Sequence, residues 1–121
     1  MKKIIVITGS PRKNGNSSKM ADGFIKTIVE GGAQATRFDA AFMKIGGCHA
    51  CDKCYKNEKA CVYDDDFNVL AKELETADGI VFVAPVYWYT FPAQIKAVID
   101  RLYAMYVGER FFEGKKCALI S

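Results

Sequence analysis

The chain has 121 residues, which is enough for one domain around a single core but not for two of ordinary size. Half of its residues are hydrophobic and 26% are charged, the composition of an ordinary soluble globular domain. Lysine and arginine exceed aspartate and glutamate by only 17 − 14 = 3, and the basic residues are scattered, so we expect no nucleic acid partner.

The N-terminal stretch MKKIIVITGSP does not resemble a secretory leader. Its apolar run ends after five residues in Gly-Ser-Pro, and no small-residue cleavage site follows. No apolar window approaches the ~20 residues that cross a bilayer. We therefore expect a cytoplasmic protein without membrane association, in a compartment where thiols stay reduced.

The first half of the chain predicts a strand, a helix and a second strand. Residues 3–8, KIIVIT, form a β-branched run that is typical of a buried parallel strand. A turn-rich loop follows, and a helix is predicted up to Gly31-Gly32. Its apolar residues at helical spacing are Met20, Phe24, Ile25 and Ile28. A weaker strand is expected over 35–39.

The second half continues the alternation. Three aspartates, 64–66, offer an N-cap and first-turn acids to a helix whose apolar face holds Phe67, Leu70 and Leu74. The run IVFVAPV, 80–86, predicts a second buried strand. Pro92 suits the first turn of a third helix, extending to Tyr106, whose apolar face comprises Ile95, Val98, Ile99 and Leu102. A last strand is predicted over KKCALIS, 115–121, where we expect Cys117 to be a buried small apolar residue.

The order β-α-β-α-β-α-β predicts an α/β fold, with one open, doubly wound parallel sheet and helices on both of its faces. We expect residues 1–121 to form a single domain. The last strand would have an exposed edge and no following helix. We therefore expect a C-terminal strand and helix to be missing from this chain.

The loop after the first strand, GSPRKNGNSS (9–18), predicts an anion site. In a doubly wound sheet, ligands bind beyond the carboxyl ends of the strands. The loop also precedes a helix N-terminus, which attracts phosphate. It has neither a Gly-Lys-Ser/Thr nor a G-x-G-x-x-G pattern, and no cysteine precedes Cys48, which excludes a phosphatase that carries its nucleophile here. A plain polar turn that caps the helix remains an alternative.

Four of the five cysteines crowd into one segment, with two, two and six residues between them. The first three match the compact run of bacterial ferredoxins, whereas structural zinc sites usually join two separated C-x2-C pairs. Zinc, reduced thiols without a metal and an iron-sulfur cluster are the open alternatives at this point. A disulfide is not expected in a reducing compartment. His49 lies between two of the cysteines, but a lone histidine on a polar loop is more often solvated.

The loop after the third predicted strand, PVYWYTFPAQIK (85–96), contains three consecutive aromatic residues, Tyr87, Trp88 and Tyr89. They cannot all enter the core, and exposed aromatic residues on a loop suggest a flat ligand or a partner surface. A phosphate site on one loop and a planar ring on the next together indicate a mononucleotide cofactor.

Three stretches, in this order, resemble the flavodoxin-like NAD(P)H-dependent FMN reductases, and within them the iron-sulfur flavoproteins. They are KIIVITGSPRKNGNS, the cysteine-rich loop that ends in CVYDDDF, and GIVFVAPVYWYTFPAQIKAVIDRL. The resemblance covers nearly the whole chain. It implies a flavodoxin-like, three-layer α/β/α fold that is truncated after the fourth strand.

The resemblance also implies site residues. The FMN phosphate would be held by Ser10, Arg12, Asn16, Ser17 and Ser18. The isoalloxazine ring would be lined by Pro85, Val86, Tyr87 and Trp88. A [4Fe–4S] cluster would be held by Cys48, Cys51, Cys54 and Cys61, although free thiols and zinc stay open.

The function implied by the resemblance is an FMN-dependent NAD(P)H oxidoreductase that passes electrons from a nicotinamide to a small acceptor (a flavin, quinone or nitro compound). No catalytic acid or base is expected, because the chemistry belongs to the flavin. The alternative is an iron-sulfur flavoprotein that exchanges electrons with a ferredoxin-like partner. A non-redox domain that binds phosphate or zinc is the third reading. Proteins of this kind associate, so a homodimer or homotetramer is expected.

Overall fold

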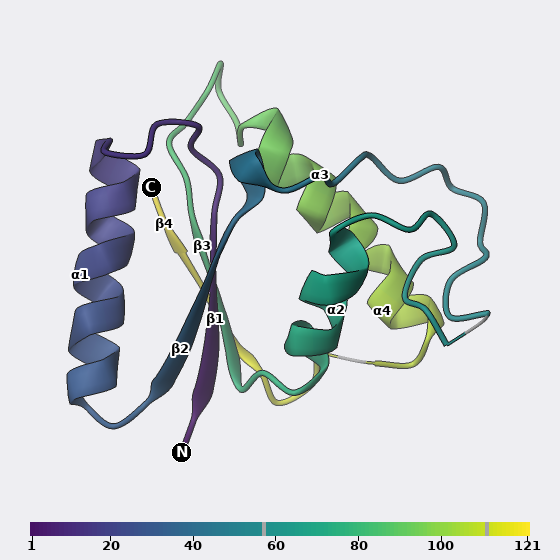
Figure 1. The fold of residues 1–121 in the computed structure, drawn as a ribbon, viewed down its shortest axis with the longest axis horizontal. Coiled ribbons are helices and arrows are strands. Elements are labelled where there is room, and N and C mark those ends of the chain that lie inside the picture. Colours follow the sequence, from purple (N-terminus) through teal and green to yellow (C-terminus); the bar gives the residue numbers. More distant parts are fainter. Residues whose placement is uncertain (57, 111) are drawn as a thin grey trace.

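The computed structural model describes residues 1–56, 58–110 and 112–121, and it contains one parallel sheet between helices (Figure 1). The sheet consists of β1 (Lys3–Thr8), β2 (Gln34–Asp39), β3 (Gly79–Val83) and β4 (Lys116–Ile120). All three strand pairings are parallel, and the strand order is β2-β1-β3-β4. This order confirms the predicted doubly wound sheet, since the chain moves outward from β1 in one direction and then from β3 in the other.

The helices cover both faces of the sheet. The helix α1 (Asn16–Glu30) lies on one face, and α2 (Phe67–Glu75), α3 (Ala93–Arg101) and α4 (Tyr103–Val107) lie on the other (Figure 1). A single 3-10 turn, η1 (Ala40–Phe42), follows β2. The predicted three-layer arrangement is therefore confirmed. Within the described ranges, no helix has the length and apolar character that a membrane crossing requires.

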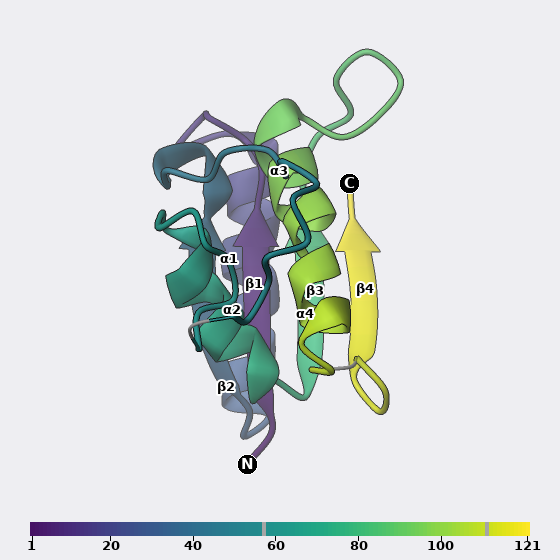
Figure 2. The same cartoon turned by 90° about the vertical axis from the view of Figure 1, so that its right-hand side faces the viewer.

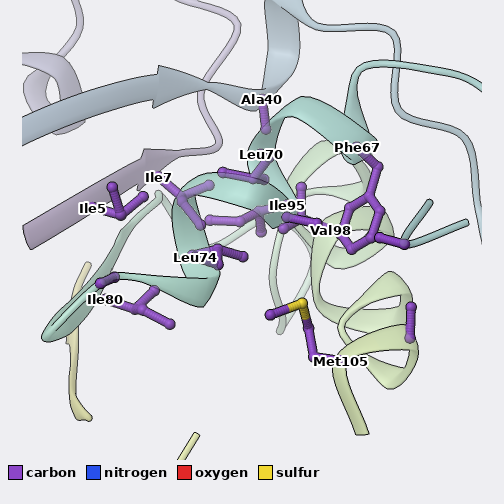
Figure 3. Packing of buried hydrophobic residues seen from close by; sticks show 14 of the residues in the cluster. Ile5, Ile7, Ala40, Phe67, Leu70, Leu74, Ile80, Ile95, Val98 and Met105 are labelled. Carbon is purple, nitrogen blue, oxygen red and sulfur yellow. The ribbon is translucent and has the colours of Figure 1, made fainter. Parts of the chain in front are cut away.

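Alternating side chains of β1 supply the two halves of the core. Ile5 and Ile7 point to the layer of α2 and α3, whereas Val6 points to α1, as the two-residue period of a strand requires. The larger cluster joins these isoleucines to the apolar faces of the covering helices (Figure 3). Its largest helical members are Phe67, Leu70, Leu74, Ile95, Val98 and Met105.

Two helix predictions need adjustment. Met20 is 37% exposed, and the buried residues of α1 include Ser17, Ser18 and Ala21, so part of the helix contacts the sheet through small residues. The single helix predicted from Pro92 to Tyr106 is divided, because α3 ends at Arg101 and α4 begins at Tyr103.

The prediction for Cys117 was wrong. This residue lies on β4, which pairs with β3 along one edge and exposes nearly all of its side chains. Cys117 is exposed because no described helix covers the faces of this edge strand, as Figure 2 shows. A central strand with the same sequence would have buried it.

Candidate functional site

The loops that follow β1 and β3 meet at the carboxyl edge of the sheet. The Gly9 amide donates a hydrogen bond of 3.0 Å to the carbonyl of Val83, which ties the first loop to the end of β3. A Cβ on Gly9 would lie 3.0 Å from the Cβ of Ile95 and 3.2 Å from that of Ala84, so this approach favours glycine. The predicted ligand-binding edge is thus assembled by neighbouring strands at the point where strand order reverses.

A pocket of about 150 Å³ opens beside the first loop, and we call it the anion pocket. It is lined by Thr8, Ser10, Arg12, Lys13, Ser18, Arg37, Asp39 and Phe42. Three of the five residues predicted to hold phosphate therefore line it, namely Ser10, Arg12 and Ser18. Ser17 is buried and Asn16 begins α1, and neither of them lines the pocket.

The two serine oxygens of the anion pocket each accept a hydrogen bond from a nitrogen. The oxygen of Ser10 accepts the Arg12 amide at 3.1 Å, and the oxygen of Ser18 accepts the Arg37 guanidinium at 2.8 Å. In the described part of the chain, neither hydroxyl donates a hydrogen bond. Each O–H is therefore left to donate into the pocket, which suits an anion with several acceptor oxygens.

The charges and the helix terminus favour the same ligand. Arg12, Lys13 and Arg37 outnumber the single carboxylate of Asp39 among the lining residues, which leaves an excess of two positive charges. The N-cap of α1 is Gly15, and no described side chain caps the first turn. The first-turn amides and the dipole of α1 can therefore act on an anion at this end of the helix.

Arg37 and Asp39 are pocket residues that sequence reasoning missed. Arg37 pairs with Asp39 at 2.8 Å and with Asp22 at 2.6 Å, and the hydroxyl of Thr8 also donates to Asp39. Burial opposes ionisation of Asp39, but the hydrogen bonds from Thr8 and Arg37 outweigh it and lower the pKa of this carboxyl. The signal in the sequence was indirect, since only the parallel pairing of β1 with β2 places Asp39 beside Thr8.

The aromatic loop forms a tight turn at the end of β3. The amide of Tyr87 donates to the carbonyl of Thr90 at 2.8 Å, and the reverse bond is 3.1 Å. Trp88 and Tyr89 occupy the two central positions and are 88% and 87% exposed. The prediction that these aromatic residues cannot all enter the core is confirmed.

The backbone of this turn is strained. Trp88 has a φ of 45° and Tyr89 a φ of 72°, the left-handed values of a type I′ turn, which normally selects asparagine and glycine. Bulky residues in that region cost about 1–3 kcal/mol each and are concentrated at functional sites. The turn thus presents two aromatic rings to solvent at the expense of stability, which fits a binding role.

A second pocket, of about 220 Å³, lies under this turn and beside β4. It is lined by Ala84, Pro85, Val86, Tyr89, Thr90, Phe91, Leu119 and Ser121. Of the four residues predicted to line the flavin ring, Pro85 and Val86 line this pocket, whereas Tyr87 and Trp88 do not. The strand order places it on the opposite side of the β1–β3 junction from the anion pocket. A ligand that occupied both pockets would pass over that junction, where Gly9 lies.

The cysteine-rich segment does not lie at this sheet edge. It extends from the helical layer, between η1 and α2 (Figure 1). Cys48, Cys51, Cys54 and Cys61 nevertheless line one common pocket, together with residues from α3 and α4. Burial, followed by the neighbouring thiols, raises the pKa of Cys54. His49 also lines this cysteine pocket, and its ring stacks on Tyr63 at a centroid distance of 4.1 Å.

The donor set of the cysteine pocket has the chemistry of a soft-metal site, because four cysteines line one small space. All five cysteines of the chain are free thiols. Among the described residues, no three His, Cys, Asp or Glu side chains are already arranged as metal ligands. The [4Fe–4S] ligand set therefore fits by composition and neighbourhood, and it remains a prediction.

Comparison with known proteins gives a family and several relatives. The family described as NADPH-dependent FMN reductase matches residues 2–121. The iron-sulfur flavoprotein of Methanosarcina thermophila is 36% identical over 99 residues, covering 82% of this chain and 51% of the relative. An iron-sulfur flavoprotein of Archaeoglobus fulgidus is 37% identical over 113 residues, covering 93% of this chain and 57% of the relative. The chain spans about half the length of the curated relatives that it matches.

Solved structures share the fold at lower identity. A putative quinone reductase from Klebsiella pneumoniae superposes with a TM-score of 0.76 at 20% identity, covering 98% of this chain and 58% of the other. The flavoenzyme NAD(P)H:(acceptor) oxidoreductase from Paracoccus denitrificans gives a TM-score of 0.72 at 22% identity, with coverages of 99% and 60%. At these identities the likeness confirms the flavodoxin-like fold alone.

Proposed function

Because this chain belongs to the NADPH-dependent FMN reductase family, we propose that the protein passes electrons from NAD(P)H through FMN to a small acceptor, such as a flavin, quinone or nitro compound. The observation that carries the proposal is the anion pocket, which is lined by two serines with hydroxyl protons left to donate and by a surplus of cations, at the edge of the sheet. The names of the relatives support the same class of chemistry.

In this proposal the residues of the chain bind and orient the cofactor. Ser10, Arg12 and Ser18 would contact the phosphate, and the amides of Asn16 and Ser17 would add donors at the start of α1. When bound, FMN would supply hydride acceptance and electron transfer, which no side chain can provide.

The second loop would hold the flat part of the cofactor. Pro85 and Val86 would line the flavin from the second pocket, while Tyr87 and Trp88 on the strained turn would cover an exposed face of the ring. A nicotinamide or an acceptor would then stack beside these aromatic residues. Their exposure in the absence of a ligand supports this role, because an aromatic surface of this kind gains most from being covered.

An iron-sulfur flavoprotein that exchanges electrons with a ferredoxin-like partner is the second candidate function. One observation favours it, namely the convergence of Cys48, Cys51, Cys54 and Cys61 on one pocket. A cluster there would take single electrons. The two candidates share the flavin site and differ only in what the cysteine pocket contains.

Further parts of the proposal concern the whole protein. Residues 1–121 would form a single FMN-binding domain that a further strand and helix would complete, and the exposed faces of β4 support this view. A cytoplasmic location and association into a homodimer or homotetramer belong to the same proposal.

The test is a visible spectrum of the complete protein, purified anaerobically with FMN and then mixed with NADPH or NADH. Bound flavin bands that bleach with the nicotinamide and return with a quinone would support the reductase. Additional broad absorption, with iron and acid-labile sulfide, would favour the electron carrier. A colourless protein that takes up no FMN would contradict both candidates and leave the phosphate- or zinc-binding domain.

A further inference from the structure

Arg101 is a buried cation that the anion pocket and the aromatic turn do not use. It is the last residue of α3 and only 4% exposed, although arginine is rarely buried without a strong partner. Its guanidinium meets both carboxylate oxygens of Asp65, at 2.7 and 2.9 Å. It also lies 4.7 Å from the centre of the Phe67 ring. This paired, bidentate geometry is the arrangement in which arginine cannot be replaced by lysine.

The same guanidinium reaches both ends of the cysteine-rich segment. It donates to the carbonyl of Gly46 at 2.9 Å, just before Cys48, and to the carbonyl of Tyr63 at 3.5 Å, just after Cys61. Its side chain lines the cysteine pocket itself. One side chain from α3 therefore contacts the backbone on both sides of all four thiols.

Two aspartates, Asp65 and Asp66, also join the two ends of the cysteine-rich segment. Asp65 accepts the amide of Gly46 at 3.1 Å, and Asp66 accepts the amide of Lys44 at 2.7 Å. The amide of Asp66 in turn donates to the carbonyl of Lys44 at 3.0 Å. Residues 44–46 and 63–66 are thus joined, and Arg101 lies at the centre of the join.

Further contacts hold the chain near two of the cysteines within the closed segment. The Asn68 side chain receives the amide of Cys61 at 2.8 Å and donates to its carbonyl at 3.1 Å. Near Cys51, Asp52 accepts the hydroxyl of Tyr103 at 2.8 Å. These contacts fix single positions, whereas Arg101, together with Asp65 and Asp66, joins the two ends of the segment.

We propose that Arg101 is the positioning residue of the cysteine site: by joining Gly46, Tyr63 and Asp65 it closes the segment, so that the four cysteines line one pocket before any metal arrives. The proposal rests on the cysteine pocket being a metal site, as in the second candidate function. The guanidinium of Arg101 also contacts Cys61. Asp65 offsets the charge of Arg101, so the contribution that we propose for Arg101 is geometric. A side chain with the same charge but a single donor point would not replace it.

The first experiment needs no metal. Reduced complete protein is treated with iodoacetamide under anaerobic conditions, and alkylation of each cysteine is followed by mass spectrometry. Arg101→Gln and Arg101→Lys are both expected to speed alkylation of the half-buried Cys54 and Cys61 by about tenfold, as local opening of the segment would. Exposed Cys117, far away on β4, serves as the internal reference and should keep its rate.

The matched control is Lys96→Gln, which removes a cation from the exposed side of the same helix, where Lys96 pairs with Asp100. It should leave all five rates unchanged. If Arg101→Gln does not fold, Arg101→Lys carries the test, since it keeps a positive charge opposite Asp65. Unchanged alkylation of Cys61 in the folded variants, or full restoration of slow alkylation by lysine, would overturn the proposal.

The second experiment uses Co²⁺ alone as a spectroscopic probe, titrated into the reduced apoprotein. Wild type should develop thiolate-to-cobalt charge-transfer absorption, and both Arg101 variants should bind about tenfold more weakly or more, the usual effect of losing support around a metal site. Equal Co²⁺ binding by wild type and variants would contradict the proposed positioning role of Arg101. If wild type binds no Co²⁺ and assembles no iron, the metal-site function fails, while the alkylation rates still decide the role of Arg101.

Discussion

At the scale of single residues, hydrogen-bond direction matters more than the mere presence of polar groups. Ser10 and Ser18 both accept a bond from a nitrogen, so each has its proton left to donate. The bond from the Arg12 amide to Ser10 is itself a common turn bond, whereas Ser18 accepts the guanidinium of Arg37 from β2. Arg12 differs from Arg37, which is held by two carboxylates, in that no carboxylate pairs with it among the described residues.

Arg12→Ala in the complete protein is expected to raise the dissociation constant for FMN roughly tenfold, because it removes a charge-assisted contact worth about 1.5 kcal/mol or more. Binding of riboflavin, which lacks the phosphate, should not change. Flavin fluorescence during titration measures both constants. Arg110→Ala, outside the anion pocket, is the control. An equal loss for both flavins, or no loss for FMN, would show that Arg12 does not contact phosphate.

At the scale of elements, α3 connects the aromatic turn to the cysteine pocket. Its first residues follow the aromatic turn, and its last residue is Arg101 in the wall of the cysteine pocket. Nine residues of helix span roughly 13 Å at 1.5 Å per residue. The helix therefore acts as a fixed spacer between the carboxyl edge of the sheet and the cysteines.

One double variant can test both the energetic cost of the strained turn and its role in flavin binding. The double change Trp88→Asn and Tyr89→Gly gives the residues that a type I′ turn favours, and both lost side chains are almost fully exposed. Urea denaturation without ligand should show an increase of about 1 kcal/mol in the free energy of unfolding, since relief of strain exceeds the loss of one edge contact between rings. Flavin affinity should fall.

Trp88→Tyr serves as the control for this double change, because it keeps an aromatic side chain and the strained backbone, and its stability should match wild type. A loss of stability in the double variant without flavin would mean that the turn is not strained. A stabilised variant with full flavin affinity would remove the aromatic turn from the proposed site.

At the scale of the whole molecule, two partly buried carboxylates, Asp65 and Asp39, make the stability of the fold depend on pH. At Asp65, burial opposes ionisation, but the hydrogen bonds from Arg101 and from the amides of Gly46 and Phe67 outweigh it and lower the pKa. The pKa of Asp39 is lowered in the same way by Thr8 and Arg37. Each folded pKa thus lies below the unfolded value of about 3.9.

The unfolded chain consequently binds more protons than the folded chain in acid, so the free energy of unfolding should fall as pH decreases. This stabilisation is present above about pH 4, the unfolded pKa, and is lost as pH falls through the folded values. Urea denaturation between pH 6 and pH 3 measures it. Asp65→Asn should lower stability at pH 6 and flatten the acid slope, whereas exposed Asp100→Asn should not. Parallel curves for wild type and Asp65→Asn would contradict the assignment.

Local sequence predicted most elements of this protein, apart from the division between α3 and α4, and it identified the loops of the candidate sites. The β-branched run Lys3–Thr8 coincides with β1, and the apolar spacing of Phe67, Leu70 and Leu74 coincides with the buried face of α2. These features depend on hydrophobic periodicity within a few residues. That pattern is present in the sequence whether or not the chain has folded. The first loop, the aromatic loop and the cysteine-rich segment were likewise identified from the residues that they contain.

Tertiary structure alone decided how distant positions combine. It placed Arg37 and Asp39 in the anion pocket through the pairing of β1 with β2, and it exposed Cys117 at the edge of the sheet. It also buried Arg101, which in sequence resembles any cation at a helix end, under a segment that begins more than fifty positions earlier. Strand order and loop closure set these neighbourhoods, and both depend on contacts between residues far apart in the chain, which local periodicity does not encode.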